Sequence, residues 1–566
     1  MYTVQIANRD YTEWSYVQAE QLKEHAEQQV KEGSTPTISP LANKLFHGDT
    51  VDASGVRIHS PYRNKAQICG VLLTSQKSYG RAVANSNKLL YKCVPDDEHL
   101  PYFLVPYEEK HIGFGKTRTD KYIQFRITDW TAVTKHPRGV ITNTFGEVAD
   151  KEAYTAYQMA CQSIDASLKT LNAASLRVLR ENALAPIPLY CEGKSIEDRR
   201  AYRIISIDPV GCADMDDALG IRVLPNGQTV FSIYIANVPL ILEYLNLWTY
   251  LTDRVSTIYL PDKKIPMLPV ALSDNLCSLR EKEDRVAFVM DITVEHRRVQ
   301  SIAYTSTIIR VEKNYAYHAA ELLGRDDYKS IVETVRDLNN SFRYLERIMT
   351  SHEVVEFCML FMNRECAKIL KAQQHGIFRS ASKKETAPED YAILAPELKS
   401  ILQNTAGAYT SAAESKPHEL IGGGLECYVH ITSPIRRIVD VVNMLAILQD
   451  KLQWSADAKQ FMAKWQSLLP MLNQKTKAIR RLQNEMELLS TYEKKEDRAY
   501  PGFLFQRSEA MEKGLYKYRA YIPETKMVTS VLSPKAYKNY AAVHFSAHLF
   551  LDEAKMTKKI RLQIMT

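Results

Sequence analysis

Four aspartates stand within ten residues of one another in a chain of 566 residues whose formal net charge is +7 at pH 7, namely Asp208, Asp214, Asp216 and Asp217. Two bare carboxylates about 4 Å apart repel each other by roughly 4 kcal/mol at an effective dielectric constant near 20, so four cannot easily converge and stay ionised. A divalent cation that prefers oxygen ligands removes this repulsion. We therefore expect the fold to bring these four side chains around a metal.

The residues on either side of the cluster predict two strands and a connection. Residues 203–207 are mostly apolar and β-branched, and residues 218–223 begin a second strand-like stretch. The carboxylates then lie between the strands. If this connection is extended, Asp214 and Asp216 point the same way and Asp217 faces elsewhere.

Other interpretations of the acidic segment and of nearby motifs are weaker. Asp-rich turns often only hydrogen-bond their own backbone, which would suffice for two aspartates. An EF-hand loop is excluded because counting from Asp214 puts Pro225 at the twelfth position, where a glutamate belongs. The glycines at 422–424 are not followed by the Lys-Ser or Lys-Thr of a phosphate-binding loop.

A second feature lies far downstream, where Ser433 and Pro434 resemble a helix start. Arg436 and Arg437 would then occupy the first turn, where cations oppose the helix dipole unless an anion binds there. A phosphate is the natural candidate. The alternative is that both arginines pair with acidic neighbours at the surface.

A metal cluster combined with an arginine that binds phosphate indicates phosphodiester hydrolysis by metal-assisted attack of water. The carboxylates would hold one or two Mg²⁺ ions, and the guanidinium of Arg436 would stabilise the charge on the scissile phosphate.

Three segments resemble the signature blocks of the RNase II (RNB) family of 3′-to-5′ exoribonucleases. They are residues 206–219 (Ser-Ile-Asp-Pro-Val-Gly-Cys-Ala-Asp-Met-Asp-Asp-Ala-Leu), 259–288 and 428–437, in the family's order. The segment Pro-Val-Gly-Cys at residues 209–212 is most similar to the corresponding segment of the family's eukaryotic exosome-type branch. The first residues show no added nuclease domain, so we expect no endonuclease activity.

The resemblance implies a set of site residues and a cofactor. Asp216 and Arg436 are expected to be catalytic together with the other three aspartates, which would hold Mg²⁺, with Mn²⁺ as an alternative. Tyr259 would be a platform for the 3′-terminal base, although a half-buried strand tyrosine is the other interpretation. The remaining expected RNA contacts are Arg437, His430, Ser433 and Tyr317, and for His430 a neutral structural role is also adequate.

The resemblance also implies an α+β fold in which an RNB catalytic domain is flanked by OB-fold β-barrels. Short strand-like runs at 70–74, 88–91, 103–106 and 122–127 suit such a barrel, and helical spacing is found at 19–31, 343–374 and 466–494. The predicted domains are a partial or degenerate first cold-shock-like region at 1–65, a cold-shock OB domain at 66–150, the RNB catalytic domain at 151–498 and an S1-like OB domain at 499–566.

Composition excludes several classes of protein. The content of hydrophobic residues is 45%, which is ample for several cores. The start lacks an apolar signal core and no apolar stretch is long enough to span a membrane, so we expect an intracellular protein, cytoplasmic or nuclear. Nine scattered cysteines without a Cys-x-x-Cys pair predict neither a zinc site nor a stable disulfide.

Four positions depart from the family pattern: Tyr234, Asn237, Asn443 and Asn484. Residues 379–381, Arg-Ser-Ala, also replace the usual Arg-x-His. These changes leave a second hypothesis open, a catalytically impaired RNA-binding protein acting in translation or RNA storage. Because all four aspartates and Arg436 remain, we favour an active exoribonuclease whose partners are single-stranded RNA and an RNA-degradation complex.

Overall fold

The computed structural model describes residues 1–18, 38–63, 67–82, 88–108, 118–181, 196–382, 407–422, 424–493, 498–509, 514–552 and 557–565. The chain divides into two compact units, which we call the terminal unit (Met1–Asp165 with Asn484–Thr566) and the central unit (Ala166–Gln483). The helix predicted at 19–31 lies outside the described residues. The predicted domain boundaries stay a prediction.

The terminal unit begins with a small antiparallel sheet in the order β2-β1-β3-β4, in the part of the chain where the sequence predicts a partial or degenerate first cold-shock-like region. Its inward side chains, such as Val4, share one hydrophobic core with Phe103 and Trp130 of the barrel that follows. The strands are β1 (Tyr2–Ile6), β2 (Trp14–Gln18), β3 (Thr50–Val51) and β4 (Arg57–His59).

The predicted cold-shock-like barrel is confirmed. Five strands close in the order β5-β6-β7-β9-β8. A Cβ atom at Gly139 would lie 2.7 Å from the ring of Phe125, so a residue without a side chain is needed where the two strands meet. Helix α1 (Lys151–Cys161) contacts the barrel and is capped by Asp150. The strands are β5 (Ile68–Leu72), β6 (Leu89–Pro95), β7 (Phe103–Tyr107), β8 (Lys121–Asp129) and β9 (Arg138–Glu147).

The C-terminal part of the terminal unit is a five-stranded antiparallel sheet in the order β23-β22-β21-β24-β25. The longest strand of this sheet is β24, whose pairing with β25 runs unbroken from His544 to Asp552. The strands are β21 (Tyr500–Glu509), β22 (Tyr516–Ile522), β23 (Met527–Ser533), β24 (Ala542–Asp552) and β25 (Thr557–Met565), and η5 (Pro523–Thr525) lies before β23.

The central unit is built on a seven-stranded sheet in the order β10-β17-β16-β13-β12-β11-β18, with antiparallel pairs in its middle and a parallel pair at each edge. The middle strand β13 is buried along nearly its whole length, which explains its run of Val, Phe and Ile. The strands are β10 (Ile196–Asp198), β11 (Ile204–Asp208), β12 (Asp217–Val223), β13 (Thr229–Ala236), β16 (Asp284–Glu295), β17 (Arg298–Arg310) and β18 (Lys313–Ala316).

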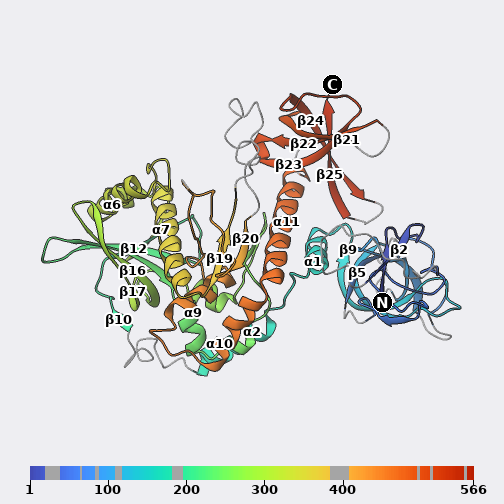
Figure 1. Cartoon of the computed structure of the whole chain (residues 1–566), viewed down its shortest axis with the longest axis horizontal. Coiled ribbons are helices and arrows are strands. Elements are labelled where there is room, and N and C mark those ends of the chain that lie inside the picture. Colours follow the sequence, from blue (N-terminus) through green and yellow to red (C-terminus); the bar gives the residue numbers. More distant parts are fainter. Residues whose placement is uncertain are drawn as a thin grey trace. The chain divides into compact units, whose positions relative to one another are not determined.

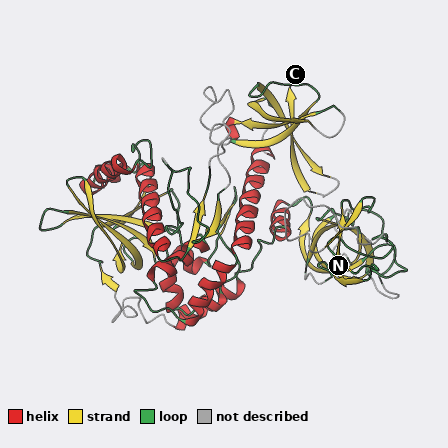
Figure 2. Cartoon of the chain, in the orientation of Figure 1, coloured by secondary structure: helices red, strands yellow, loops and turns green. Residues whose placement is uncertain are grey.

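Helices of the central unit pack beside this sheet (Figure 1; Figure 2), and together the units confirm the predicted α+β class. The helix predicted at 343–374 begins only at residue 351. Thr350 and Glu353 form a capping box there, and Arg343 adopts a left-handed conformation that ends the preceding helix. The helical segments are α2 (Lys169–Glu181), α4 (Val238–Tyr244), η2 (Trp248–Tyr250), η3 (Ala271–Leu276), α5 (Ala320–Gly324), α6 (Asp326–Phe342), α7 (Ser351–Ala372), α9 (Ile438–Leu448), α10 (Ala456–Ser467) and α11 (Leu469–Glu493), the last continuing into the terminal unit.

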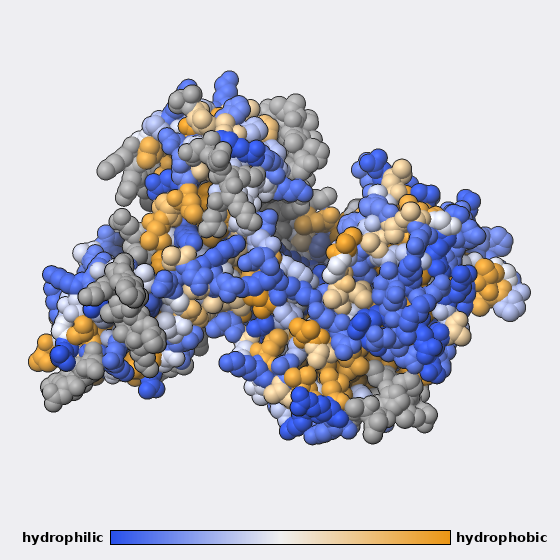
Figure 3. All heavy atoms as spheres, turned by 180° about the vertical axis from the view of Figure 1, so that it is seen from behind, coloured by the Kyte–Doolittle hydropathy of each residue, from blue (hydrophilic) through white to orange (hydrophobic). Residues whose placement is uncertain are grey.

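Two short hairpins complete the central unit: β14 (Ile258–Tyr259) with β15 (Lys264–Ile265), and β19 (Ile377–Ser380) with β20 (Ala408–Ser411). The face of the molecule in Figure 3 is mostly hydrophilic, with small hydrophobic patches. Among the described residues, no helix has both the length and the apolar character that crossing a membrane requires.

Candidate active site

The carboxylates lie where two neighbouring strands of the central sheet meet, as the sequence predicted. Asp208 ends β11 and Asp217 begins β12, and these strands pair antiparallel through Ile204 and Gly220. The Tyr317 N–H donates to the Asp208 carbonyl oxygen at 3.1 Å. The reason is that β18 runs parallel to β11, so that Tyr317, which follows the end of β18, lies beside Asp208.

Asp216 and Arg436 meet although 220 residues separate them. The Asp216 side chain is buried and accepts a hydrogen bond from the Ile435 N–H at 2.9 Å and another from Arg436 Nε at 3.1 Å. The Arg436 side chain remains 43% exposed, so part of the guanidinium is open to a ligand.

The predicted helix start at Ser433 is wrong. Residues 433–436 form a turn, and α9 begins at Ile438 without a side-chain cap. The reason is tertiary: the Thr257 N–H donates to the Arg436 carbonyl at 3.0 Å and the Ile438 N–H donates to the Val255 carbonyl at 2.9 Å, which holds this stretch extended. Arg436 and Arg437 are therefore not first-turn residues, and the expected anion would be bound by a guanidinium and not by a helix terminus.

Asp440 organises this turn. Its carboxylate is fully buried and accepts from Arg437 Nε at 2.8 Å and Nη2 at 2.9 Å, and also from the Ser433 N–H at 2.7 Å. The Ser433 hydroxyl accepts from Arg436 Nη2 at 2.8 Å. Ser433 and Asp440 thus hold the two arginines in place, and the RNA contacts expected of Ser433 and Arg437 stay predictions.

Burial sets the electrostatics of the acidic cluster. It raises the pKa of Asp208 to about 6, with a further contribution from Asp214. It raises the pKa of Asp216 to about 7, although Arg436 opposes the rise. The pKa of Asp217 is raised well above its usual value by burial and then by Asp208. The charges of Asp208 and Asp216 both act on Asp217.

Lys264 is a site residue that the sequence did not reveal. Its Nζ lies 2.9 Å from Asp214 and 3.3 Å from Asp274. It stands opposite Tyr259 in the hairpin of β14 and β15. A tight turn between two apolar runs was a signal for the hairpin, but the ion pair depends on tertiary placement that no local pattern reports.

The donor chemistry of the cluster fits an oxygen-preferring divalent cation. All four side chains are carboxylates, and Asp208 Oδ2 is buried without a hydrogen-bond partner. Within the described residues, however, no three His, Cys, Asp or Glu side chains already surround one point as metal ligands. Asp214 turns to Lys264 and Asp216 to Arg436, so side-chain rotation is needed before the oxygens share an ion.

The predicted aromatic contacts differ in accessibility. Tyr259 is 43% exposed and lies near Arg436 and Asp214. Tyr317 packs its ring 5.2 Å from that of His352, and burial with the nearby Asp217 raises its pKa to about 12. His430 hydrogen-bonds the Tyr409 hydroxyl through Nδ1 at 2.9 Å, which is the structural arrangement left open above.

Three of the four departures from the family pattern have structural partners. Tyr234 is buried beside Arg199. Asn237 caps α4 by accepting from the Leu240 N–H. Asn443 accepts from the Ile377 N–H at 2.7 Å and donates to the His430 carbonyl at 2.9 Å, so it fixes the segment before Ser433. Asn484 is exposed on α11.

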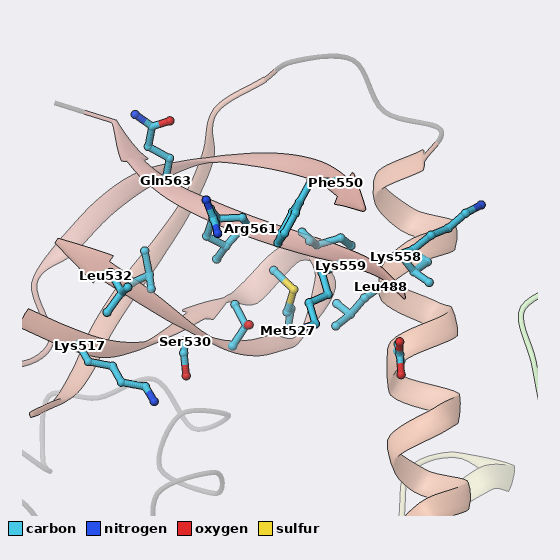
Figure 4. Close-up of a pocket in the computed structure, with 16 residues that line it drawn as sticks. Leu488, Lys517, Met527, Ser530, Leu532, Phe550, Lys558, Lys559, Arg561 and Gln563 are labelled. Atoms are coloured by element: carbon cyan, nitrogen blue, oxygen red, sulfur yellow. The ribbon is translucent and has the colours of Figure 1, made fainter. Parts of the chain in front are cut away.

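A groove of about 920 Å³ lies in the terminal unit between β23, β25 and the end of α11 (Figure 4). Apolar side chains make up the largest part of its lining, together with the ring of Phe550 and four basic residues that include Lys517 and Arg561. The Arg561 guanidinium lies 4.7 Å from the centre of the Phe550 ring. Such a surface is suited to the phosphates and bases of a single strand.

Comparison with known proteins identifies the family. Residues 196–350, which contain all four aspartates, match the family model described as RNB domain. The chain therefore carries an RNB domain. Residues 90–157 match the Dis3-like cold-shock domain 2 model, in agreement with the closed barrel.

The curated relatives of the chain are distant. The chain is 33% identical over 274 residues to the exosome complex exonuclease dis3 of Schizosaccharomyces pombe, covering 45% of the chain and 27% of the relative. It is 24% identical over 355 residues to exosome complex exonuclease RRP44 homolog A of Arabidopsis thaliana, covering 60% and 36%. The chain thus spans about a third or less of the length of these relatives.

Solved structures share the fold over more of the chain. RNase R of Mycoplasma genitalium in complex with ribose-methylated single-stranded RNA matches with a TM-score of 0.69 at 16% identity, covering 100% of both chains. Yeast Ssd1, described as a pseudonuclease, matches with a TM-score of 0.57 at 15% identity, covering 88% of this chain and 70% of the other.

Proposed function

We propose that this chain is a Mg²⁺-dependent 3′-to-5′ exoribonuclease that hydrolyses single-stranded RNA to 5′-nucleoside monophosphates. The observation that carries the proposal is the meeting of the buried Asp216 with Arg436 beside Asp208 and Asp217. Relatives named as exosome complex exonucleases support it.

The side chains divide the chemistry. When bound, Mg²⁺ supplies a polarised water and positive charge at the phosphate, and Asp208, Asp214, Asp216 and Asp217 would hold it. Arg436 donates from Nε to Asp216 and from Nη2 to the Ser433 hydroxyl. Its Nη1 has no partner among the described residues. This nitrogen is therefore the donor we assign to the scissile phosphate oxygen.

Tyr259 and Tyr317 flank the cluster and would hold the 3′-terminal nucleotide. The exposed ring of Tyr259 is available for stacking, whereas Tyr317 is tied by its backbone to Asp208. The groove of the terminal unit would guide the incoming strand, and an RNA-degradation complex inside the cell, in cytoplasm or nucleus, is the proposed setting.

A second candidate function is RNA binding without hydrolysis. It is favoured by one observation, that Lys264 and Arg436 neutralise Asp214 and Asp216 while no three carboxylates surround one point in the described part of the chain. The likeness to a pseudonuclease fold is compatible with it.

The test uses the full chain with a 5′-labelled single-stranded RNA, with Mg²⁺ or with EDTA. We expect a progressive ladder, 5′-monophosphate products and no shortening in EDTA. Asp216→Asn should slow the reaction by roughly 10²–10³-fold, as loss of one preorganised electrostatic group does. The matched control is Asp253→Asn, a half-exposed carboxylate of the central unit that pairs with Lys464. Binding without Mg²⁺-dependent shortening would instead establish the second candidate.

A further inference from the structure

The arginines near the active site are not equally neutralised. Arg436 pairs with Asp216 at 3.1 Å, and Arg437 pairs with Asp440 at 2.8 Å. Arg379 is also near and only 9% exposed, yet no ion pair or side-chain hydrogen bond joins it to any described residue. A buried guanidinium without a counter-charge is strongly unfavourable, so this residue calls for an anion.

Three local features position the Arg379 guanidinium. Its backbone N–H donates to the Tyr428 carbonyl at 2.8 Å, which fixes β19 against the segment before His430. The guanidinium lies over the Tyr409 ring, 4.9 Å from its centre. A Cβ atom at residue 407 would lie 2.6 Å from Arg379 Nη2, so Gly407 leaves the room that the guanidinium occupies.

Among the described residues, the other titratable groups around Arg379 do not supply negative charge. Burial, with the added effect of Arg379, lowers the pKa of His418 to about 4, and burial with Arg437 and Arg379 lowers that of His430 well below its usual value. Both rings are therefore neutral near pH 7. Arg480 adds a further positive charge near Arg379.

Helix α11 explains why Arg480 faces this cluster. Asn473 accepts from the Tyr409 N–H at 2.7 Å and donates to its carbonyl at 2.8 Å, so this face of α11 lies against β20. Arg480 follows seven residues later, which is two helical turns, and lies on the same face. Arg481 is turned about 100° away.

We propose that Arg379 and Arg480 form a binding subsite for an internucleotide phosphate of single-stranded RNA, upstream of the phosphate held by Arg436. This inference rests on the proposed function. Contacts support it, because the Arg379 guanidinium lies over the Tyr409 ring and the Tyr409 hydroxyl hydrogen-bonds His430, in the segment that leads to Arg436. A phosphodiester carries one negative charge and two free oxygens. The planar guanidinium of an arginine can donate two parallel hydrogen bonds to these oxygens.

The experiment measures equilibrium binding of the full chain in EDTA to a short 5′-fluorescein oligouridylate, in which each linkage in turn is replaced by a neutral methylphosphonate. We expect one internal linkage at which the neutral group weakens binding roughly tenfold or more, as loss of a charge-assisted hydrogen bond does. Arg379→Met should weaken binding of unmodified RNA to a similar extent and abolish the discrimination at that linkage. The slope of log Kd against log salt should fall by about 0.7.

Arg480→Gln serves as the second variant, since an exposed side chain can be replaced without unfolding the chain even if Arg379→Met is unstable. It should lower both affinity and salt slope, whereas the matched control Arg481→Gln should leave both unchanged. If RNA is bound and shortened but neither Arg379→Met nor Arg480→Gln changes the phosphonate profile, the subsite is refuted while the proposed function stands. If the unsubstituted chain binds no RNA, both are refuted.

Discussion

Replacing Asp440 with asparagine should destabilise the central unit and displace Arg436, the arginine that we assign to the scissile phosphate. The native carboxylate is 0% exposed and accepts two hydrogen bonds from Arg437 and one from the Ser433 N–H. Asparagine keeps one acceptor, but its amide faces a guanidinium that then lacks a counter-charge. Breaking a buried pair costs about 3–5 kcal/mol. Because Arg437 retains 24% of its side-chain exposure, we take the lower limit, about 3 kcal/mol.

This free energy converts into a measurable shift. Unfolding a unit of about 320 residues carries an entropy of roughly 0.67 kcal/mol/K, so about 3 kcal/mol lowers the melting temperature by about 4–5 °C. Differential scanning calorimetry would measure it, with RNA hydrolysis as the second readout. Asp450→Asn, an exposed position just beyond α9, is the control and should melt like the unsubstituted chain. A shift below about 1 °C together with full activity would refute the assigned role of Asp440.

Three further expectations concern the site. Lys264→Met removes the cation beside Asp214, so the Mg²⁺ concentration for half-maximal activity and the Mn²⁺ dissociation constant should both fall severalfold. Lys264→Arg keeps the charge and should restore both values. A rise in either value for Lys264→Met would contradict the ion-pair argument. Tyr259→Ala should weaken RNA binding by about 1–3 kcal/mol while Tyr259→Phe preserves it, and equal losses would exclude stacking. The pKa of His418 is depressed to about 4, so between about pH 6.5 and 4 only the unfolded chain binds this proton and stability falls on acidification. His418→Gln should reduce that loss by up to about 1.4 kcal/mol per pH unit in urea denaturation at pH 5 and 7, and an unchanged slope would contradict it.

The strands around the acidic cluster could be predicted because their signals are local. An apolar β-branched run before Asp208 and another after Asp217 correspond closely to β11 and β12. The barrel strands were found for the same reason. Helix α7 was predicted too long at its beginning because apolar spacing continues through residues 343–350, while the cap at Thr350 decides where the helix starts.

The arrangement of the site could not be predicted because tertiary contacts decide it. Ser433 and Pro434 are a good local helix start, but pairing of 436–438 with 255–257 overrides that preference. Lys264 carries no sequence signal of its own, and Arg379 is marked only by the Arg-x-His pattern, which does not reveal what the guanidinium contacts. One gains its role by meeting Asp214, and the other by meeting no acid in the described part of the chain.

Asp216 contacts Ile435 and Arg436, which follow it in the chain by 219 and 220 residues. This separation has a consequence for the synthesis of the protein. At about 5–20 residues per second, the ribosome needs roughly 10 to 45 s to add the arginine after the aspartate. Until then the acidic strand ends have no guanidinium to cover them and remain hydrated. The terminal barrel can form early in translation, whereas the central sheet completes the candidate site only when most of the chain has emerged.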